Sequence, residues 1–167
     1  MIEISLPSWI VALPDEIKIA GVAALPIFEL RGAIPIGCNI LGISAIGKVY
    51  FLSILGNLVP VLPLLLFFKY FFHHLENIKF IGKFFKWWFC RVEKKSKLIE
   101  RWGFWGLVLF VAIPLPVTGA WTGTVAANLF EIKVKRAFLA ILLGVVIAGV
   151  IVSLIVSGIV QLWFSSV

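Results

Sequence analysis

The sequence contains few charged residues and very few that carry sulfur. Charged residues make up 14% of its 167 residues, and it has two cysteines and one methionine. The cysteines, Cys38 and Cys90, are isolated, so we expect neither a disulfide nor a metal site. No phosphate-binding loop, zinc motif or nucleophile–base arrangement appears, so we expect no enzymatic activity and no cofactor. No lysine or arginine precedes Lys18, so we also expect no cleaved signal peptide.

Hydrophobic residues dominate what is present. They account for 62% of the chain and give a mean hydropathy of +1.11, well above the range of soluble domains. We therefore expect a single membrane domain over residues 1–167, in the cell (inner or plasma) membrane. The net charge of +7 would also suit a nucleic acid partner. Because the cations gather beside apolar segments, we expect anionic lipid headgroups instead, and no nucleic acid.

The apolar segments predict an all-α polytopic membrane protein. The expected elements are an interfacial segment at 1–14, a re-entrant loop at 17–47, a transmembrane helix at 50–72, an amphipathic cytoplasmic helix at 76–101, a second re-entrant loop at 102–130 and a transmembrane helix at 137–160. Each arm of a loop has about a dozen residues and reaches ~18 Å as a helix, against ~30 Å of hydrocarbon. The arms are therefore too short to cross the membrane.

Positive charge predicts the orientation. Lysines and arginines are concentrated in residues 73–101 and 133–136, so both segments are expected in the cytoplasm. The stretch 102–130 must then leave the membrane on the side it entered, and the same reasoning places both termini outside. The halves become loop-plus-helix units of opposite orientation, an inverted repeat like that of many secondary transporters. Two short matches support the repeat: Ala33-Ile34-Pro35 with Ala112-Ile113-Pro114, and Leu55-Gly56 with Leu143-Gly144.

The segment between the halves has its own pattern. Apolar residues recur at helical spacing within 76–101, from Ile78 to Ile99, and lysines and arginines fill the opposite face. This pattern predicts a helix that lies on the inner leaflet and binds anionic lipid headgroups. A plain connector and a lipid-sensing or gating element both fit it.

Each re-entrant loop has a break rich in proline and glycine. The first break, residues 29–37, contains Glu29 and Arg31, two charged residues well inside an apolar stretch. Ionisable groups at membrane depth usually pair or face water, and they mark functional sites. Desolvation favours the uncharged form of a carboxylate, so Glu29 is a candidate proton carrier, and Arg31 its ion-pair or substrate-binding neighbour. A purely structural pair that locks the loop is the alternative.

The second break, residues 112–123, offers hydroxyls and an indole in place of charges. Thr118 and Thr122 are candidate substrate ligands, and Trp121 is either a stacking wall for a substrate or an interfacial anchor. Unpaired backbone N–H groups at the break would form an anion site. Asn57 and Pro60 of the first transmembrane helix are expected to support the loops. The residues expected to shape the loop tips are Gly32, Pro35, Gly37, Pro114, Pro116, Gly119 and Gly123.

Three strings together resemble a known family. They are Glu-Leu-Arg-Gly-Ala-Ile-Pro-Ile-Gly from Glu29, Leu55-Gly56-Asn57-x-x-Pro60, and Ala-Ile-Pro-Leu-Pro-Val-Thr-Gly-Ala-Trp-Thr-Gly from Ala112. Over about residues 20–155 they look like the small multidrug export protein family. That family is similar in turn to the DedA (VTT, SNARE-associated) superfamily, whose members have two facing re-entrant loops and are implicated in proton-coupled transport or lipid flipping.

The resemblance implies functional positions in both loops. They are Glu29, Pro35 and Gly37 in the first loop and Pro114, Thr118 and Gly119 in the second. DedA proteins typically carry arginines around the second loop's proline, whereas this chain has Val111, Ala112 and Val117 there. Arg31 would then supply the cation from the other loop.

Three functions remain open. The leading one is a small secondary transporter, with proton coupling, that moves an amphiphilic or lipid-like substrate through a midplane site between the loops. An uncoupled lipid flippase or scramblase of the DedA type and a non-transporting membrane-organising protein are the alternatives. A polar groove that exposes Glu29 and Arg31 to lipid would favour a scramblase, whereas a pair sealed from water would favour a structural role. A homo-oligomer fits each of them.

Overall fold

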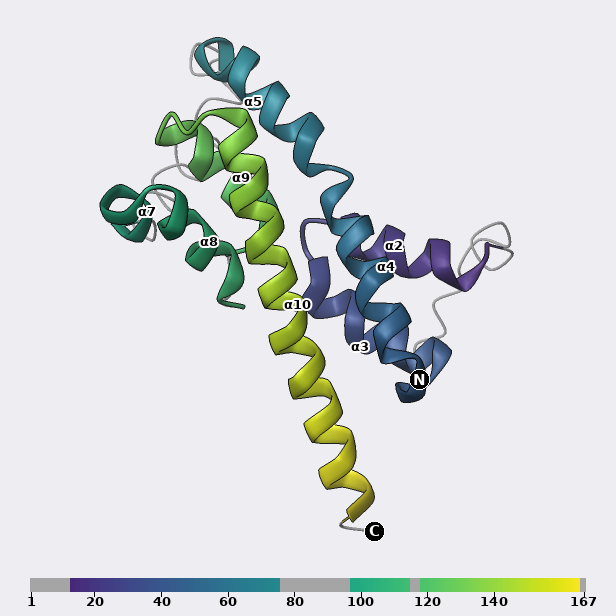
Figure 1. Cartoon of the computed structure of the whole chain (residues 1–167). Coiled ribbons are helices and arrows are strands. Elements are labelled where there is room, and N and C mark those ends of the chain that lie inside the picture. Colours follow the sequence, from purple (N-terminus) through teal and green to yellow (C-terminus); the bar gives the residue numbers. More distant parts are fainter. Residues whose placement is uncertain (1–12, 76–96, 115–117, 166–167) are drawn as a thin grey trace.

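The computed structural model describes residues 13–75, 97–114 and 118–165. The interfacial segment expected at 1–14 and the amphipathic helix expected at 76–101 lie almost entirely outside these residues, as do Pro116 and Cys90. Within them the chain is all-helical, as expected for an all-α protein. The helices are α2 (Asp15–Ala24), α3 (Glu29–Leu41), the short η1 (Ile43–Ala45), α4 (Ile46–Leu58), α5 (Val61–Leu75), α7 (Lys97–Trp102), α8 (Phe104–Ala112), α9 (Ala120–Leu129) and α10 (Val134–Ser165) (Figure 1).

Two stretches of the described chain are long and apolar enough to cross a membrane, by length and composition. One, Ile43–Tyr70, joins η1, α4 and most of α5, and the other, Val134–Ile159, covers most of α10. They run in opposite directions in Figure 1, where α4 and α5 rise and α10 descends to the C-terminus. By contrast α2, α3, α8 and α9 have 10, 13, 9 and 10 residues, too few for ~30 Å of hydrocarbon.

Proline ends the first helix of each broken segment. α2 stops before Pro26, where Leu25 is extended with ψ 137°, and α8 stops before Pro114, where Ile113 is extended with ψ 116°. The ring of a proline clashes with the preceding residue in helical conformation, so that residue becomes extended. Both breaks therefore follow from the same local conflict.

The first break was expected at residues 29–37, and this expectation is wrong. These residues belong to α3, so Gly32, Pro35 and Gly37 lie inside a helix and not at a loop tip. Pro35 deletes one backbone hydrogen bond, but its ring is exposed and displaces no packed neighbour. Packing of α3 on α2, α4 and α10 holds the rest of the helix. The break lies earlier, around Pro26.

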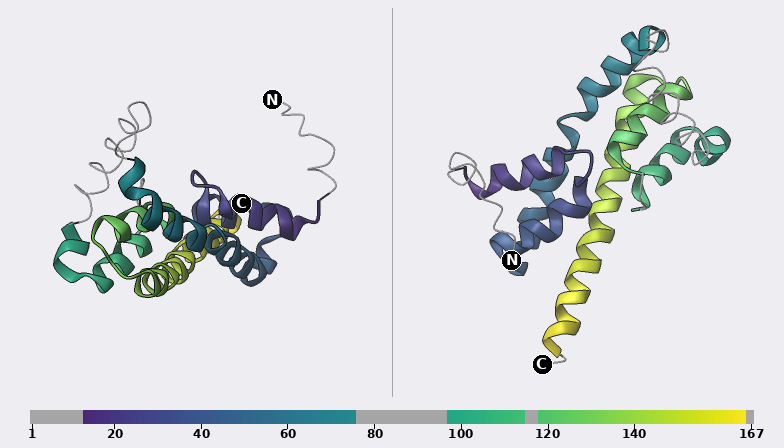
Figure 2. Two further views of the ribbon diagram at one scale, coloured as in Figure 1. Left: turned by 90° about the horizontal axis from the view of Figure 1, so that it is seen from above. Right: turned by 180° about the vertical axis from the view of Figure 1, so that it is seen from behind.

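The helices pack in a crossed arrangement. α2 lies against α4 and α8 lies against α10, so each first arm packs on the span that follows it. The second arms also reach the opposite span, because α3 packs on α10 and α9 packs on α5 (Figures 1 and 2). As a result α3 and α9 bring residues from the two halves of the chain together at the centre.

Glycines permit the closest of these approaches. A Cβ on Gly56 of α4 would collide with the backbone of Ala20 in α2. A Cβ on Gly144 of α10 would lie 2.9 Å from the Val108 carbonyl oxygen and 2.6 Å from Val111 Cβ, both in α8. These glycines belong to the matching pairs Leu55-Gly56 and Leu143-Gly144. Gly56 lies where α4 meets α2, and Gly144 lies where α10 meets α8.

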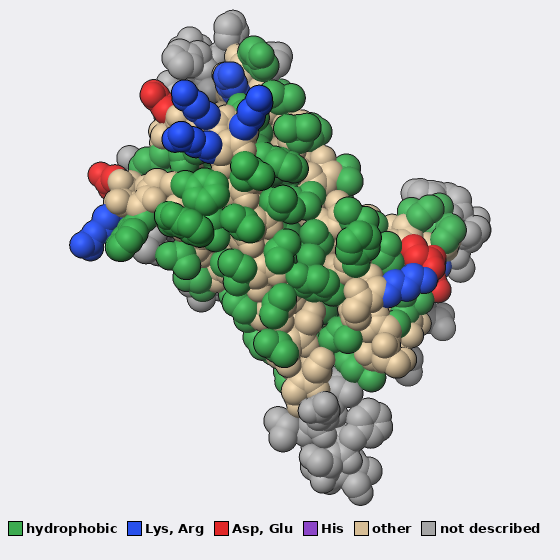
Figure 3. Space-filling model, viewed as in Figure 1, with side chains coloured by type: hydrophobic (Ala, Val, Ile, Leu, Met, Phe, Trp, Pro, Cys, Tyr) green, Lys and Arg blue, Asp and Glu red, His purple; other side chains and the backbone are tan. Residues whose placement is uncertain are grey.

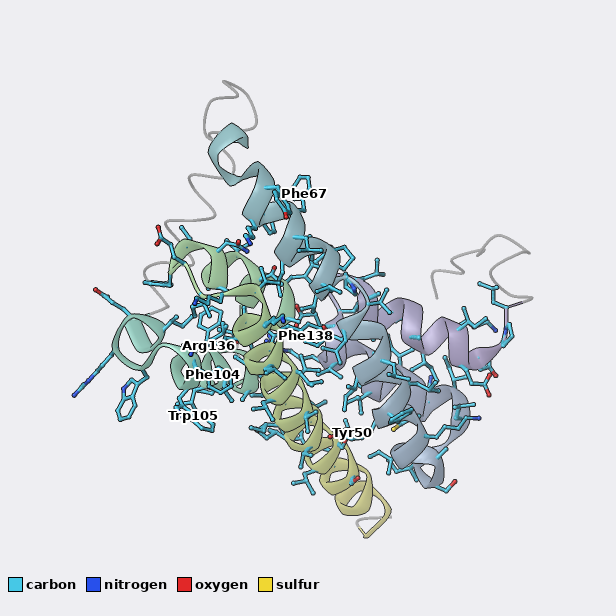
Figure 4. All side chains as sticks on the ribbon, turned by 45° about the horizontal axis from the view of Figure 1, so that its top comes forward. Tyr50, Phe67, Phe104, Trp105, Arg136 and Phe138 are labelled. Carbon is cyan, nitrogen blue, oxygen red and sulfur yellow. The ribbon has the colours of Figure 1, made fainter. Side chains whose placement is uncertain are left out.

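The core lies where the two spans and their arms meet. Its fully buried side chains come from both halves of the chain, among them Ile19, Ile34, Val49, Leu107, Val125, Ile141 and Val145. A direct hydrogen bond joins the spans, from the Tyr50 hydroxyl to the Val146 carbonyl at 3.1 Å, and Tyr50 lies against α10 in Figure 4. This apolar core adjoins the polar groups that α3 and α9 carry.

Candidate functional site

Glu29 opens α3 and reaches across to α9. Its φ of 46° lies in the left-handed region, which residues other than glycine rarely adopt. Its amide donates to the Leu25 carbonyl at 3.0 Å, so the chain turns sharply after α2. The carboxylate Oε1 then accepts a hydrogen bond from the Trp121 amide at 3.3 Å, and the carboxylate fills the place of a Cβ on Gly119. Glu29 thus caps the first turn of α9, whose own N-cap residue has no side chain.

Arg31 holds the residue just before that turn. Its Nη2 donates to the Thr118 carbonyl and lies 3.2 Å from Thr118 Oγ1. Thr118 Oγ1 donates in turn to the Ile113 carbonyl at 2.8 Å, which ties the start and end of the second break together. The charges of Glu29 and Arg31 also attract each other. The two residues singled out by the sequence therefore hold one segment jointly, through separate hydrogen bonds.

Trp121 and Thr122 are engaged by the protein itself. The Trp121 indole donates to the Ala24 carbonyl at 3.2 Å, at the end of α2, while its amide binds Glu29. Trp121 is therefore an anchor between the two broken segments. The Thr122 hydroxyl donates to the Gly119 carbonyl at 3.3 Å, within the first turn of α9. Neither residue lines the cavity that lies beside them.

This cavity lies between the charged pair and the two spans. Its lining includes Glu29, Arg31, Asn57 and Gly119, with Val145 and Ala148 of α10. Asn57 is fully buried, and neither its Oδ1 nor its Nδ2 has a hydrogen-bond partner. Leaving such groups unsatisfied costs on the order of 1–3 kcal/mol, so they mark a place suited to a further polar group. The sequence predicted Asn57 as a support for the loops, and the structure places it in the cavity wall.

The remaining glycines and prolines shape the scaffold around the cavity. A Cβ on Gly37 or Gly123 would lie 2.5 Å and 2.7 Å from valine side chains of α4 and α8, so both glycines allow helices to pack closely. Gly32 is similarly crowded by the Phe28 side chain at 2.8 Å. Pro114 ends α8, and Pro60 lies at the junction of α4 and α5. These residues position the site without lining it.

The sequence reasoning missed Pro26, although a signal for it was present. The number of residues from Pro26 to Gly56 equals the number from Pro114 to Gly144. The same offset relates Ala20 to Val108, the residues whose backbones those glycines contact. Ala24-Leu25-Pro26 and Ala112-Ile113-Pro114 therefore both lie where a helix ends, whereas Pro35 of Ala33-Ile34-Pro35 lies inside α3.

In the residues that the structure describes, the fold and the site define an all-helical membrane protein with two candidate spans and a half-buried charged pair beside them. The chain belongs to the family described as "Putative small multi-drug export protein", whose sequence model matches residues 29–151. That match begins at Glu29 and ends within α10, so it includes both charged residues and Asn57. Comparison with curated proteins gives no match, and comparison with solved structures gives none either.

Proposed function

We propose that the protein is a small secondary transporter that couples movement of an amphiphilic substrate to protons. The observation that carries this proposal is the position of Glu29, a half-buried carboxylate at the meeting of α3 and α9, beside a cavity that Arg31 and Asn57 also line. A carboxylate in such a setting can gain and lose a proton as its surroundings change. The family description, a small multidrug export protein, supports a transporter.

The proposed architecture is an inverted repeat of two re-entrant loops, as in the DedA superfamily. Helices α2 and α3 would form the first loop, and α8 and α9 the second, each followed by a span. The constant offset that relates Pro26 to Pro114 and Gly56 to Gly144 supports the repeat. The opposite directions of the two spans support the inversion. The substrate site would then lie near the bilayer midplane, where the loops meet.

The charge distribution supports one orientation. Lys133, Lys135 and Arg136 lie at the start of α10, and Figure 3 shows Lys and Arg side chains gathered at that end of the molecule. At the other end, near the start of α4, Lys48 is paired with Glu16 at 2.8 Å. An excess of cations favours the cytoplasmic side, so the start of α10 is proposed to face the cytoplasm and the turn before α4 the outside.

Cysteine labelling tests this orientation. In a variant with Cys38 and Cys90 replaced by serine, Arg101→Cys and Lys135→Cys are expected to react with a membrane-impermeant maleimide from the cytoplasmic side alone. Ser44→Cys, in the exposed turn before α4, is expected to react from outside. Labelling of positions 101 and 135 from opposite sides would show that the segment between them crosses the membrane and would rule out the second re-entrant loop.

Reconstitution tests the transport function. In sealed vesicles with a trapped pH indicator, an amphiphilic probe added outside is expected to drive proton movement through the protein. Decanesulfonate and decyltrimethylammonium, below the concentrations at which vesicles leak, are suitable probes of opposite charge. An uncoupled scramblase would instead move a fluorescent phospholipid between leaflets at a rate independent of pH, with no proton movement. A protein without a transport role would give neither signal.

A further inference from the structure

The first turn of α9 is an anion-binding position that the protein fills with its own carboxylate. Helix N-termini carry unpaired N–H groups and a partial positive charge, and both favour anions. The N-cap, Gly119, has no side chain to satisfy them, and no side-chain cap is formed within the helix. The partner comes instead from the other half of the chain, since Glu29 Oε1 accepts from the Trp121 amide.

A second observation is that a side chain beside this position has hydrogen-bonding groups that no protein atom satisfies. The Asn57 amide lies in the wall of the same cavity, fully buried, with its donor and its acceptor both unpartnered. Glu29 lines the same cavity, but its carboxylate accepts a hydrogen bond from α9 and forms none with the Asn57 amide. A ligand that bonds to Asn57 would remove the cost of burying those two atoms.

The cavity is too small to hold a substrate headgroup beside the carboxylate. Its free space is about that of a single water molecule. A larger group must therefore take the place of the Glu29 carboxylate at the start of α9. Arg31 is the other charged residue in the lining, and the residues that α4, α8, α9 and α10 contribute carry no charge. An entering anion would face an ionised Glu29 with one cation to balance two negative charges.

We propose that the first turn of α9 binds the anionic group of the substrate, an amphiphilic oxyanion such as a sulfonate, carboxylate or phosphate, and that it does so when a protonated Glu29 has vacated it. This inference rests on the proposed transport function and narrows its substrate class. The Trp121 amide and Asn57 Nδ2 donate to the anion, and Asn57 Oδ1 accepts from the Glu29 carboxylic acid. One proton from solvent and one anion then occupy the site together and move in the same direction.

Calorimetry on the purified full-length protein in detergent tests this exchange. A sulfonate stays ionised across the pH range used, so any proton taken up on binding comes to the protein. Decanesulfonate is expected to bind with uptake of about one proton at pH 8, read from the dependence of the heat on the buffer's ionisation enthalpy. Glu29→Gln is expected to retain binding and to lose the proton uptake, because glutamine needs no proton to leave the turn.

Asparagine variants supply the matched comparison. Asn57→Ala is expected to weaken decanesulfonate binding about tenfold, the loss of one hydrogen bond to a charged group. Asn39→Ala, at an exposed position on α3, is expected to bind like the wild type. Equal binding by both variants would overturn the role of Asn57, and loss of binding in a folded Glu29→Gln protein would overturn the exchange.

Two further probes identify the ligand. If methanesulfonate, which lacks the long alkyl chain, binds as tightly as decanesulfonate, the anion site would be supported and its ligand would be a small free anion. Decyltrimethylammonium binding with release of a proton would overturn the inference, because Glu29 would then bind cations directly. Proton uptake on decanesulfonate binding without flux in vesicles would refute the transport function and keep the anion site. Proton-linked flux without that uptake would refute the anion site alone.

Discussion

Glu29→Gln is expected to reduce proton-linked flux to the level of protein-free vesicles while the fold stays intact. Glutamine has nearly the same size and keeps a side-chain oxygen that can accept the hydrogen bond from the Trp121 amide, so the cap on α9 is retained. It cannot bind or release a proton in the working pH range, so coupling is lost. Flux is read from the trapped pH indicator, and size-exclusion profiles and thermal melts report the fold.

Glu16→Gln is the matched control for this experiment. Glu16 lies near the start of α2 and forms a 2.8 Å ion pair with Lys48. The hydrogen bond from Lys48 lowers the pKa of Glu16, so this carboxylate stays charged at neutral pH and has no coupling proton to carry. Its substitution is expected to leave flux near the wild-type level. Wild-type flux from a stable Glu29→Gln protein would remove Glu29 from the transport mechanism.

Combining Glu29→Gln with Arg31→Ala distinguishes a transport role of the charged pair from a structural one. If the pair mainly locks the second break, Glu29→Gln and Arg31→Ala should each lower the melting temperature. The double substitution should then cost less than the sum of the two, because both residues hold the segment that precedes α9. A transport role for Glu29 instead predicts lost flux from Glu29→Gln without a loss of stability.

Gly56→Ala is expected to destabilise the protein by about 2–3 kcal/mol, near the upper end of the cost of overpacking. The added Cβ would collide with the backbone of Ala20, so α2 would have to move away from α4. A flexible side chain could yield to the methyl group, whereas a helix backbone can move only as a unit. Equilibrium unfolding in detergent micelles measures the effect.

The control for this substitution lies on the same helix. A Cβ on Gly47 meets nothing within 4 Å, so Gly47→Ala is expected to be neutral or to stabilise α4 by up to about 1 kcal/mol. Gly144→Ala should resemble Gly56→Ala, because its Cβ would meet the Val108 carbonyl and Val111 in the corresponding arm. Equal stability of Gly56→Ala and Gly47→Ala would contradict the close packing of α2 on α4.

The helical class and the two long apolar segments could be predicted from the sequence because both depend on composition and length. The first break could not be placed correctly from its prolines alone. Pro26 and Pro35 each forbid one backbone hydrogen bond, and the choice between them depends on which helix has neighbours to hold it. α3 packs on three helices and tolerates Pro35, whereas α2 ends at Ala24, before Pro26.

The charged residues of the site could be predicted, and their partners could not. Glu29 and Arg31 stand out because charge is rare in an apolar stretch. Their ligands, the Trp121 amide and Thr118, belong to the other half of the chain and depend on how α3 meets α9. Asn57 was visible as a polar residue in a span, but its unsatisfied amide appears once the surrounding helices are in place.

The left-handed backbone of Glu29 has an energetic consequence. That conformation costs a non-glycine residue roughly 1–2 kcal/mol. The contacts of the Glu29 carboxylate with Trp121 and Gly119 stabilise the residue in it. Once a proton neutralises the carboxylate, those contacts weaken while the backbone cost persists. If the turn between α2 and α3 has a second conformation, a loss of about 1.4 kcal/mol of stabilisation would shift the balance between the two about tenfold. If Glu29 carries the proposed coupling proton, its protonation would therefore favour a rearrangement of the turn between α2 and α3.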